Sequence, residues 1–237
     1  MSYPERIVPG ETAPGILALH LARYVFAERW CDDGEVLDLG CGTGYGSFRL
    51  SRVARKVIGG DISVEAVEYA RGHYGAPNLE FAVLDATVLP FGDASFDVVC
   101  SFETIEHVDN PKKLVHEVAR VLRPGGTFVV STPRAEETTH KPANPHHRVE
   151  FARADFERLL GGAFGSVELY GERRIETRRH TLLRRLDVLG LRRRSALLRR
   201  AAAFTGTPAT ENVALDDVIV TREHVDTARV MIAVCSR

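Results

Sequence analysis

Hydrophobic and polar positions change their spacing several times along the chain. Short apolar runs closed by glycine, proline or acidic residues are typical of buried strands, and they alternate with stretches whose apolar positions recur every three to four residues, as on one face of a helix. The strands predicted in this way are Glu35–Leu39, Lys56–Gly59, Leu79–Leu84, Phe96–Ser101, Thr127–Ser131, Ser166–Tyr170 and Ala228–Cys235. The helices predicted between them are Gly46–Ala54, Val64–His73, Pro111–Leu122 and Ala154–Leu160. Strands that alternate with helices indicate βαβ units with right-handed crossovers and a parallel sheet.

We therefore expect an α/β fold of the Rossmann-like kind, with a seven-stranded, mostly parallel sheet and helices on both faces. Residues 1–34 form an N-terminal helical arm, and residues 35–171 form the core. Residues 172–227 are interpreted as a basic helical insertion that caps the acceptor side, because eleven arginines with interleaved leucines follow one another between residues 173 and 200. Residues 228–237 return to the core as its last strand.

The composition bounds the class of protein. The 237 residues are enough for one large domain with a cap, and too few for two full enzymatic domains. The formal net charge of −1 gives no reason to expect nucleic acid or a membrane as a partner. The N-terminus has no apolar signal region, and no apolar run is long enough to span a bilayer. The four cysteines are scattered without a CxxC pair, which favours a reducing, cytoplasmic location.

A glycine-rich turn follows the first predicted strand and opens a helix. It reads Val-Leu-Asp-Leu-Gly-Cys-Gly-Thr-Gly-Tyr-Gly over residues 36–46. Glycine lets the backbone turn tightly and lie against a ligand, and a helix N-terminus offers free N–H groups to a carboxylate. Asp61 ends the second strand, at the position where an acid would hold the hydroxyls of a ribose.

The turn resembles motif I of the class I S-adenosylmethionine-dependent methyltransferases, and further matches follow in that family's order over about residues 30–133. They are an acidic loop at residues 60–63, an adenine loop at residues 84–91, and strand signatures at residues 93–101 and 122–126. The resemblance implies S-adenosylmethionine as the cofactor. The implied cofactor-binding residues are Asp38, Gly40, Cys41, Gly42, Gly44, Asp61, Ile62, Asp85, Ala86 and Ser101. Two alternatives stay open: a dinucleotide dehydrogenase, whose fingerprint has a different glycine spacing, and a cofactor-binding relative without turnover.

The arm supplies a further candidate for the cofactor. His20, Arg23 and Tyr24 lie on consecutive helical turns, and Arg23 would meet the methionine carboxylate as the arm closes over the site. The alternative is a helix packed on the sheet with Arg23 in water.

A second group of polar residues follows the fourth predicted strand. Glu103, Glu106 and His107 are spaced i, i+3 and i+4, so a helical turn would bring them to one face beside the methyl group. Two neighbouring carboxylates repel each other, and a cation would relieve the repulsion. The loop after the fifth strand carries His146 and His147, and it can reach the same place because the fifth strand lies next to the fourth.

This pattern resembles metal-dependent methyltransferases that modify the 2′-hydroxyl at the 3′ end of small RNAs, and bacterial methyltransferases that act on glycans and glycolipids. The resemblance implies a divalent metal, Mg²⁺ or Mn²⁺, held by Glu103, Glu106, His107 and His147. A metal bound to two neighbouring hydroxyls would orient them and lower the pKa of the attacking one.

A metal-free interpretation of the same residues stays open. His107 or His146 is then the expected general base. Acids such as Glu150 would pair with Arg148 or Arg153.

We therefore expect an O-methyltransferase that acts on a hydroxyl of a saccharide-type acceptor, such as a sugar, a glycan or a glycolipid precursor. The alternatives are an RNA 2′-O-methyltransferase, a metal-free methyltransferase of a quinone or phenol, and a non-catalytic cofactor-binding protein. The arginine clusters would hold phosphate-bearing acceptors, touch an anionic membrane, or form a solvated face. No aromatic residue lies between residues 182 and 200, which counts against base stacking and so against RNA.

Overall fold

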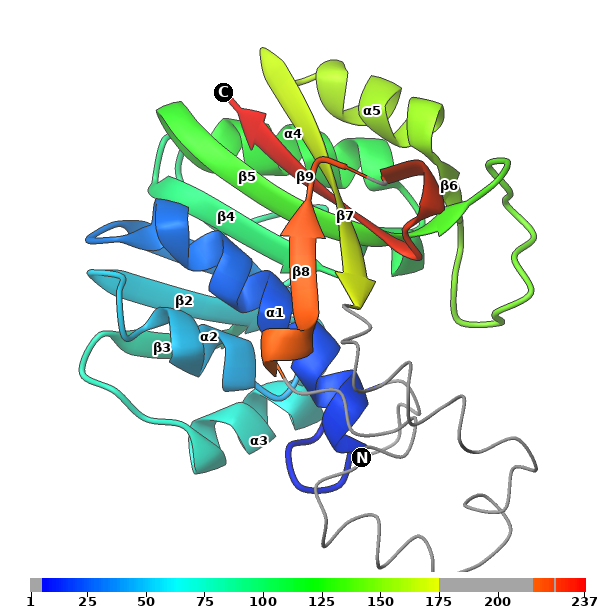
Figure 1. The fold of residues 1–237 in the computed structure, drawn as a ribbon. Helices are drawn as coiled ribbons and strands as arrows, with labels where there is room; N and C mark the ends of the chain where they lie inside the picture. Colours follow the sequence, from blue (N-terminus) through cyan, green and yellow to red (C-terminus); the bar gives the residue numbers. More distant parts are fainter. Residues whose placement is uncertain (1–5, 175–214, 224) are drawn as a thin grey trace, which may run out of the picture.

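A mixed β-sheet lies at the centre of the fold (Figure 1). The computed structural model describes residues 6–174, 215–223 and 225–237, and among them the sheet has nine strands. The strands are β1 (Glu35–Leu39), β2 (Lys56–Asp61), β3 (Leu79–Val83), β4 (Phe96–Phe102), β5 (Leu122–Ala135), β6 (Phe151–Ala152), β7 (Ser166–Arg174), β8 (Val218–Thr221) and β9 (Val230–Ser236). The α-helices are α1 (Pro14–Cys31), α2 (Tyr45–Leu50), α3 (Val64–His73), α4 (Pro111–Val121) and α5 (Arg153–Gly161). Short 3-10 helices are η1 (Ile105–His107), η2 (Leu215–Asp217) and η3 (Val225–Thr227).

The parallel part of the sheet positions the site. Strands follow the order β3-β2-β1-β4-β5-β9-β7-β8, and the first five are parallel to one another. The strand order reverses at β1, because β2 lies on one side of it and β4 on the other. Ligands of open α/β sheets bind at such a switch point, beyond the carboxyl ends of the strands. The predicted α/β fold with a mostly parallel sheet is confirmed.

The antiparallel part differs from the prediction in its number of strands. β9 pairs antiparallel with β5 and β7, and β7 pairs antiparallel with β8. We predicted seven strands, and the structure adds β8 and the two-residue β6, which pairs with β5. β8 is the run Val-Ile-Val-Thr, whose β-branched side chains favour a strand. Four residues are too few for a hydrophobic pattern to indicate a strand from the sequence alone.

Two parts of the predicted insertion, residues 172–227, belong to the sheet. Residues 172–174 continue β7, and residues 218–221 form β8. The two segments pair with each other, which fixes both to the core. The predicted basic helices fall mainly within residues 175–214, which lie outside the described residues.

Helices cover both faces of the sheet, and successive strand residues alternate between the faces. Val36 and Val98 pack with residues of α1 and α2 in one cluster of buried side chains. Leu37 and Val99 pack with residues of α4 and α5 in the other. This alternation follows from the period of two along a strand. Figure 1 shows α1 in front of the sheet and α4 behind it.

Two helices begin beside the edge where the parallel strands end. Ser63 caps α3, because its hydroxyl accepts a hydrogen bond from the Ala66 N–H at 3.3 Å. Asn110 caps α4 in the same way, accepting from the Lys113 N–H at 3.0 Å, and Pro111 occupies the first turn. α3 follows β2 and α4 follows β4, so both N-termini lie near the switch point.

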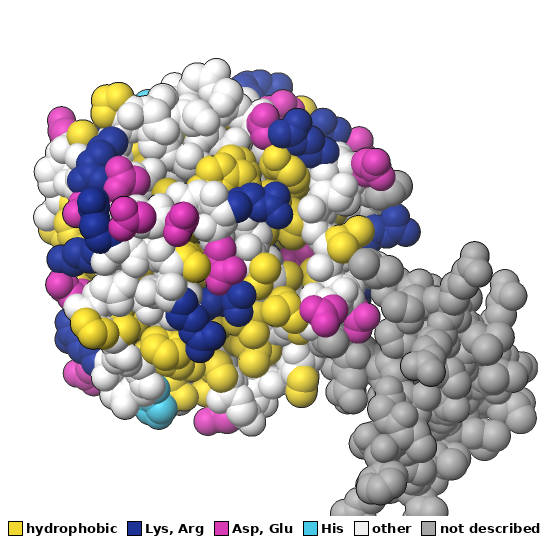
Figure 2. Space-filling model, turned by 60° about the vertical axis from the view of Figure 1, so that its left-hand side comes forward, with side chains coloured by type: hydrophobic (Ala, Val, Ile, Leu, Met, Phe, Trp, Pro, Cys, Tyr) yellow, Lys and Arg dark blue, Asp and Glu magenta, His cyan; other side chains and the backbone are white. Residues whose placement is uncertain are grey.

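The surface carries charges of both signs. Figure 2 shows basic and acidic side chains interspersed on the face it presents, in keeping with the formal net charge of −1. Among the described residues, no helix is long and apolar enough to cross a membrane.

Candidate active site

A cavity of ≈ 1010 Å³ lies at the carboxyl ends of β1 and β4. Its size is that of a pocket for a drug-sized ligand, about 300–1,000 Å³. Most of the predicted site residues line it: Gly40, Cys41, Gly42, Asp61, Ile62, Asp85, Ala86, Glu103, Glu106, His107, His146 and His147. Four others are not part of its lining: Arg23, Asp38, Gly44 and Ser101. The arm also contributes to the wall, through Arg6, Ile7, Ile16, His20 and Tyr24.

The glycine turn is shaped by close approach and by backbone conformation. Gly40, Gly42 and Gly44 all have positive φ angles, of 78°, 54° and 87°. A Cβ at Gly40 would lie 2.2 Å from the Thr104 hydroxyl, whereas a Cβ at Gly42 would meet nothing within 4 Å. The space beside Gly42 is therefore free for a ligand that lies against the backbone.

Asp61 holds this turn from the end of β2. One carboxylate oxygen accepts the Gly42 N–H at 2.9 Å, and the other accepts the Ser63 N–H at 2.9 Å. The carboxylate also lines the cavity, where an acid is suited to receive hydroxyl protons of a ribose.

Asp38 lies behind the turn rather than in the cavity wall. Its side chain is fully buried and accepts hydrogen bonds from Ser47 Oγ at 2.5 Å and from Tyr24 Oη at 3.3 Å. Burial raises the pKa of Asp38 to about 7, against the lowering effect of these hydrogen bonds. In this structure Asp38 supports the turn through α1 and α2.

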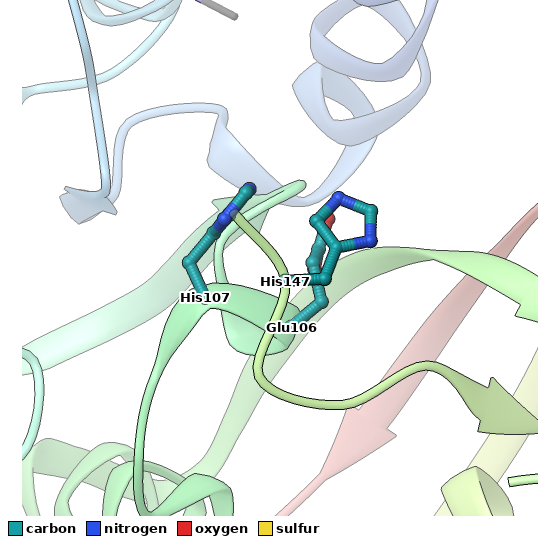
Figure 3. A group of neighbouring side chains, drawn as sticks. All are labelled: Glu106, His107 and His147. Carbon is teal, nitrogen blue, oxygen red and sulfur yellow. The ribbon is translucent and has the colours of Figure 1, made fainter. Parts of the chain in front are cut away.

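Glu106, His107 and His147 converge from two separate segments (Figure 3). One potential ligand atom from each lies within 4.8 Å of the other two. Glu106 and His107 belong to η1, and His147 comes from the loop before β6. The Arg148 N–H donates to the Glu106 carbonyl at 2.7 Å, which fastens this loop onto η1.

Both imidazoles are held by their Nδ1 atoms. His107 Nδ1 lies 3.0 Å from the His146 carbonyl oxygen, and His147 Nδ1 lies 2.8 Å from Glu150 Oε1. A carbonyl or an ionised carboxylate only accepts, so Nδ1 carries the proton on each ring. In the neutral form of each ring, Nε2 is then the nitrogen with a lone pair, as a metal ligand requires. His147 Nε2 lies 3.0 Å from the Asn144 amide nitrogen.

The Glu106 carboxyl is fully buried. Oε2 accepts a hydrogen bond from Thr132 Oγ1 at 3.1 Å, whereas Oε1 has no hydrogen-bond partner. Burial raises the pKa of Glu106 well above its ordinary value, and the nearby Glu103 adds to this effect. A bound cation would use the unpartnered oxygen and favour the ionised carboxylate.

Residues 37–130 match the model of a family described as a methyltransferase domain. This part of the chain is similar to methyltransferase domains. A probable S-adenosylmethionine-dependent methyltransferase of Mycolicibacterium smegmatis is 38% identical over 168 residues, which are 69% of this chain and 65% of that protein. A fatty-acid O-methyltransferase of the same organism is 38% identical over 119 residues, or 49% of this chain and 43% of that one. The chain thus spans less than two thirds of the length of these relatives.

A solved structure shows the same fold. The YcgJ protein of Bacillus subtilis matches with a TM-score of 0.62 at 19% identity, covering 92% of this chain and 98% of that chain. This likeness confirms the predicted fold, and the sequence relatives include a probable S-adenosylmethionine-dependent methyltransferase.

Two of the predicted cofactor-binding residues, Arg23 and Ser101, are buried outside the lining of the cavity. Arg23 is buried, and its guanidinium forms two hydrogen bonds to Glu172, the shorter at 2.7 Å. Burial alone would lower the pKa of Arg23, but Glu103 and Glu172 outweigh it and raise the pKa. Nε and Nη2 of Arg23 bond to Glu172, whereas Nη1 has no hydrogen-bond partner among the described residues, and the expected contact with the methionine carboxylate stays a prediction. Ser101 is buried in β4, and its hydroxyl has no hydrogen-bond partner.

Three of the four predicted metal ligands converge in the structure. Glu103 is not a member of the group formed by Glu106, His107 and His147. Its backbone has a positive φ of 49°, and η1 begins only at Ile105, so the helical spacing does not extend back to it. Glu103 therefore does not share a helical face with Glu106 and His107.

Two other contacts around the site were not predicted from the sequence. Glu150 pairs with His147 rather than with Arg148 or Arg153. Thr43 Oγ1 donates to the Ile7 carbonyl at 2.7 Å, which ties the arm to the glycine turn. Only the i, i+3 spacing between His147 and Glu150 would have indicated the first of these contacts.

The arm brings a neutral imidazole to the cavity. His20 lines the wall, and burial together with the nearby Arg23 lowers its pKa to about 3. His20 is therefore uncharged at neutral pH and is available only as a hydrogen-bonding group.

Proposed function

We propose that this protein is an S-adenosylmethionine-dependent O-methyltransferase that uses a divalent cation to present an acceptor hydroxyl. The observation that carries the proposal is the convergence of Glu106, His107 and His147 in the wall of the cavity that the glycine turn also lines. The glycine turn, which we call the cofactor end, and the three converging side chains, which we call the cation end, thus face the same cavity. Transfer of a methyl group between two bound molecules requires this.

The cofactor end fits S-adenosylmethionine. The open space beside Gly42 admits a ligand against the backbone, and Asp61 reaches the same cavity with its carboxylate. Ile62 and Asp85 continue the wall from the ends of β2 and β3, where the adenine would lie. S-adenosylmethionine, when bound, supplies an electrophilic methyl group on a sulfonium.

The cation end fits a divalent metal. Two imidazoles with protonated Nδ1 atoms offer their Nε2 atoms, and one buried carboxyl offers an unpartnered oxygen. Carboxylate ligands suit Mg²⁺ and Mn²⁺ and imidazole ligands suit Zn²⁺, so the mixed set fits more than one divalent ion. Glu150 behind His147 is the kind of outer partner that orients metal-binding histidines. A divalent cation bound there supplies a Lewis acid that lowers the pKa of a bound hydroxyl.

The chain's own residues would then arrange an in-line displacement. The bond from the methyl carbon to sulfur breaks as the bond to the acceptor oxygen forms, and the hydroxyl loses its proton. His146 lines the cavity next in sequence to His147, and we assign it the role of proton acceptor.

For the acceptor we propose a saccharide-type hydroxyl with a second oxygen beside it. A cation held by three protein atoms keeps coordination positions for two acceptor oxygens, and neighbouring sugar hydroxyls fit such a pair. The support for oxygen as the methylated atom includes the fatty-acid O-methyltransferase among the relatives.

The test uses the full chain and separates the cofactor from the cation. Calorimetry should detect binding of S-adenosylhomocysteine, and Asp61→Asn should weaken it at least tenfold, whereas the exposed Asp226→Asn should not. Mn²⁺ binding, followed by electron paramagnetic resonance, should be lost in His147→Gln and kept in His140→Gln, a control in the same loop.

Turnover tests the acceptor. Formation of S-adenosylhomocysteine should be measured with methyl glycosides, nucleotide sugars, short RNA, a catechol and a fatty acid, each with EDTA and after Mn²⁺ is restored. EDTA-sensitive turnover of the sugars supports the proposal. Turnover that chelation leaves unchanged would favour metal-free catalysis by His107 or His146, and no turnover with any acceptor would favour a cofactor-binding protein.

A further inference from the structure

Two glutamates stand three positions apart at the end of β4, and the structure holds them in different ways. Glu103 Oε1 accepts a hydrogen bond from Ser131 Oγ at 2.7 Å, and Glu106 Oε2 accepts one from Thr132 Oγ1 at 3.1 Å. Ser131 and Thr132 are successive residues of β5, so their side chains point to opposite faces of the sheet. The two carboxyl groups are thereby drawn apart.

The neighbouring residues of β5 show which side chains of this strand face α1 and which face α4. Val129 packs in the cluster with α1, and Val130 packs in the cluster with α4. With a period of two, Ser131 shares the face of α1 and Thr132 the face of α4. Glu103 is therefore held on the α1 side, and Glu106 is held on the side of η1 and α4.

A buried cation of the protein holds Glu103 on the α1 side. Arg23 Nη1 lies 3.5 Å from Glu103 Oε1, and the other two nitrogens of the guanidinium bond to both carboxylate oxygens of Glu172. Arg23 is 3% exposed and Glu172 is 8% exposed, so water screens these charges little. The paired geometry with Glu172 fixes the plane of the guanidinium, and so fixes where its third nitrogen points.

The backbone of Glu103 is part of the same arrangement. Its φ of 49° lies in the left-handed region, which is costly for a residue with a side chain. The Glu103 N–H donates to the Ser131 carbonyl at 3.2 Å and to Ser131 Oγ at 3.1 Å, and these bonds hold the strained conformation. Strain that is held in place at a cavity wall points to a functional requirement.

We propose that Arg23 and Glu172 are positioning residues that keep Glu103 out of the cation site, so that the site has three protein ligands instead of four. This inference rests on the proposed cation site of Glu106, His107 and His147. Mn²⁺ and Mg²⁺ take about six ligands in octahedral sites, so three protein ligands leave about three positions open. Those positions accommodate two neighbouring acceptor oxygens and one water, whereas a fourth protein ligand would remove one of them.

The first test asks whether Glu103 is a ligand. Mn²⁺ bound to the full chain is measured by electron paramagnetic resonance for its Kd and by water proton relaxation for the number of coordinated waters. Glu103→Gln keeps the size of the side chain and an oxygen for Ser131. It should leave the water number unchanged and weaken Mn²⁺ binding by less than tenfold, through the lost charge alone. Glu106→Gln, the matched change, should weaken binding more than a hundredfold.

The second test asks whether Arg23 and Glu172 do the positioning. The double variant Arg23→Gln and Glu172→Gln removes both buried charges together, so neither is left without a partner. Glu103, released from the guanidinium, should enter the site and reduce the number of coordinated waters by about one. The double variant Arg123→Gln and Asp97→Gln, which removes an ion pair at the far ends of the strands, should leave the number unchanged.

The outcomes separate this inference from the proposed function. Absence of Mn²⁺ binding by the unmodified protein would overturn both. Binding by the unmodified protein, together with an increase of one coordinated water in Glu103→Gln, would overturn this inference and leave the cation site standing. An unchanged water number in the Arg23 and Glu172 double variant would likewise overturn the positioning role.

Discussion

Tyr24 Oη lies 3.3 Å from each carboxylate oxygen of Asp38, and the contact joins α1 to the strand that leads into the glycine turn. A Cβ at Gly46 would lie 1.9 Å from the Tyr24 ring, so the ring lies directly on the first turn of α2. The arm is therefore part of the support of the cofactor turn. The Tyr24 hydroxyl donates its hydrogen bond to the Asp38 carboxyl, and burial raises the pKa of that carboxyl.

This burial predicts how stability depends on pH. The folded pKa of Asp38 is about 7 and its ordinary value is 3.8, so the folded protein binds this proton more tightly than the unfolded chain does. The resulting stabilisation is full below pH 3.8 and is lost as the pH rises to about 7. Asp38→Asn should therefore flatten the fall in the free energy of unfolding between pH 5 and 8, as measured by urea unfolding.

The exposed Asp226→Asn serves as the control and should leave the slope of the unmodified protein intact. The raised pKa values of Glu106 and Glu172 act in the same direction, so part of the slope should persist in Asp38→Asn. A slope identical to that of the unmodified protein would show that Asp38 does not bind the proton.

Mn²⁺ should stabilise the folded protein through Glu106. A ligand at a hundred times its Kd adds about 2.7 kcal/mol to the free energy of unfolding. For a protein of this size that corresponds to a rise in Tm of about 5–10 °C. Glu106→Gln should remove the rise in Tm. It should leave the metal-free protein at least as stable at pH 8, because the buried Glu106 carboxyl lacks a full set of hydrogen-bond partners and a neutral amide replaces it. Thermal unfolding with and without Mn²⁺ measures this, and an equal rise in Glu106→Gln would exclude Glu106 as a ligand.

The two partners of the His147 ring should have different effects on the metal. Glu150 holds Nδ1 and so orients the ring, whereas Asn144 occupies Nε2 and competes with a cation. Glu150→Ala should weaken Mn²⁺ binding about 10–100-fold, as removal of such an outer partner does elsewhere. Asn144→Ala should leave the affinity equal or higher. Titrations with Mn²⁺ compare the two, and a stronger loss in Asn144→Ala would contradict the assignment of Nε2 as the ligand.

The parallel strands and the glycine turn were predictable because their signals are local. Glu35–Leu39 and Val64–His73 have the bounds that the pattern indicated, and β8 escaped only because it is four residues long. The turn is recognisable because positive φ angles and close approach demand glycine at Gly40 and Gly44.

The details of the candidate site depend on contacts between distant segments, which spacing does not reveal. Glu103 and Glu106 look equivalent in the sequence, yet Ser131 and Thr132 draw them to opposite faces of the sheet. Arg23 looked like a ligand for an anionic cofactor group because a free arginine is suited to one. Its partner Glu172 lies 149 positions along the chain, where no local pattern connects the two.

Comparison of Gly42 with Gly125 distinguishes the effect of backbone strain on stability from the effect of a side chain on cofactor binding. Gly42 and Gly125 both have positive φ, of 54° and 79°, and a Cβ at either would meet nothing within 4 Å. Alanine at each should therefore lower the free energy of unfolding by a similar amount, about 1–2 kcal/mol. Gly42 lines the cavity and Gly125 does not, so only Gly42→Ala should weaken binding of S-adenosylhomocysteine, by at least tenfold. Urea unfolding and calorimetry measure the two effects side by side. Equal binding by both variants would mean that the cofactor does not lie against the turn.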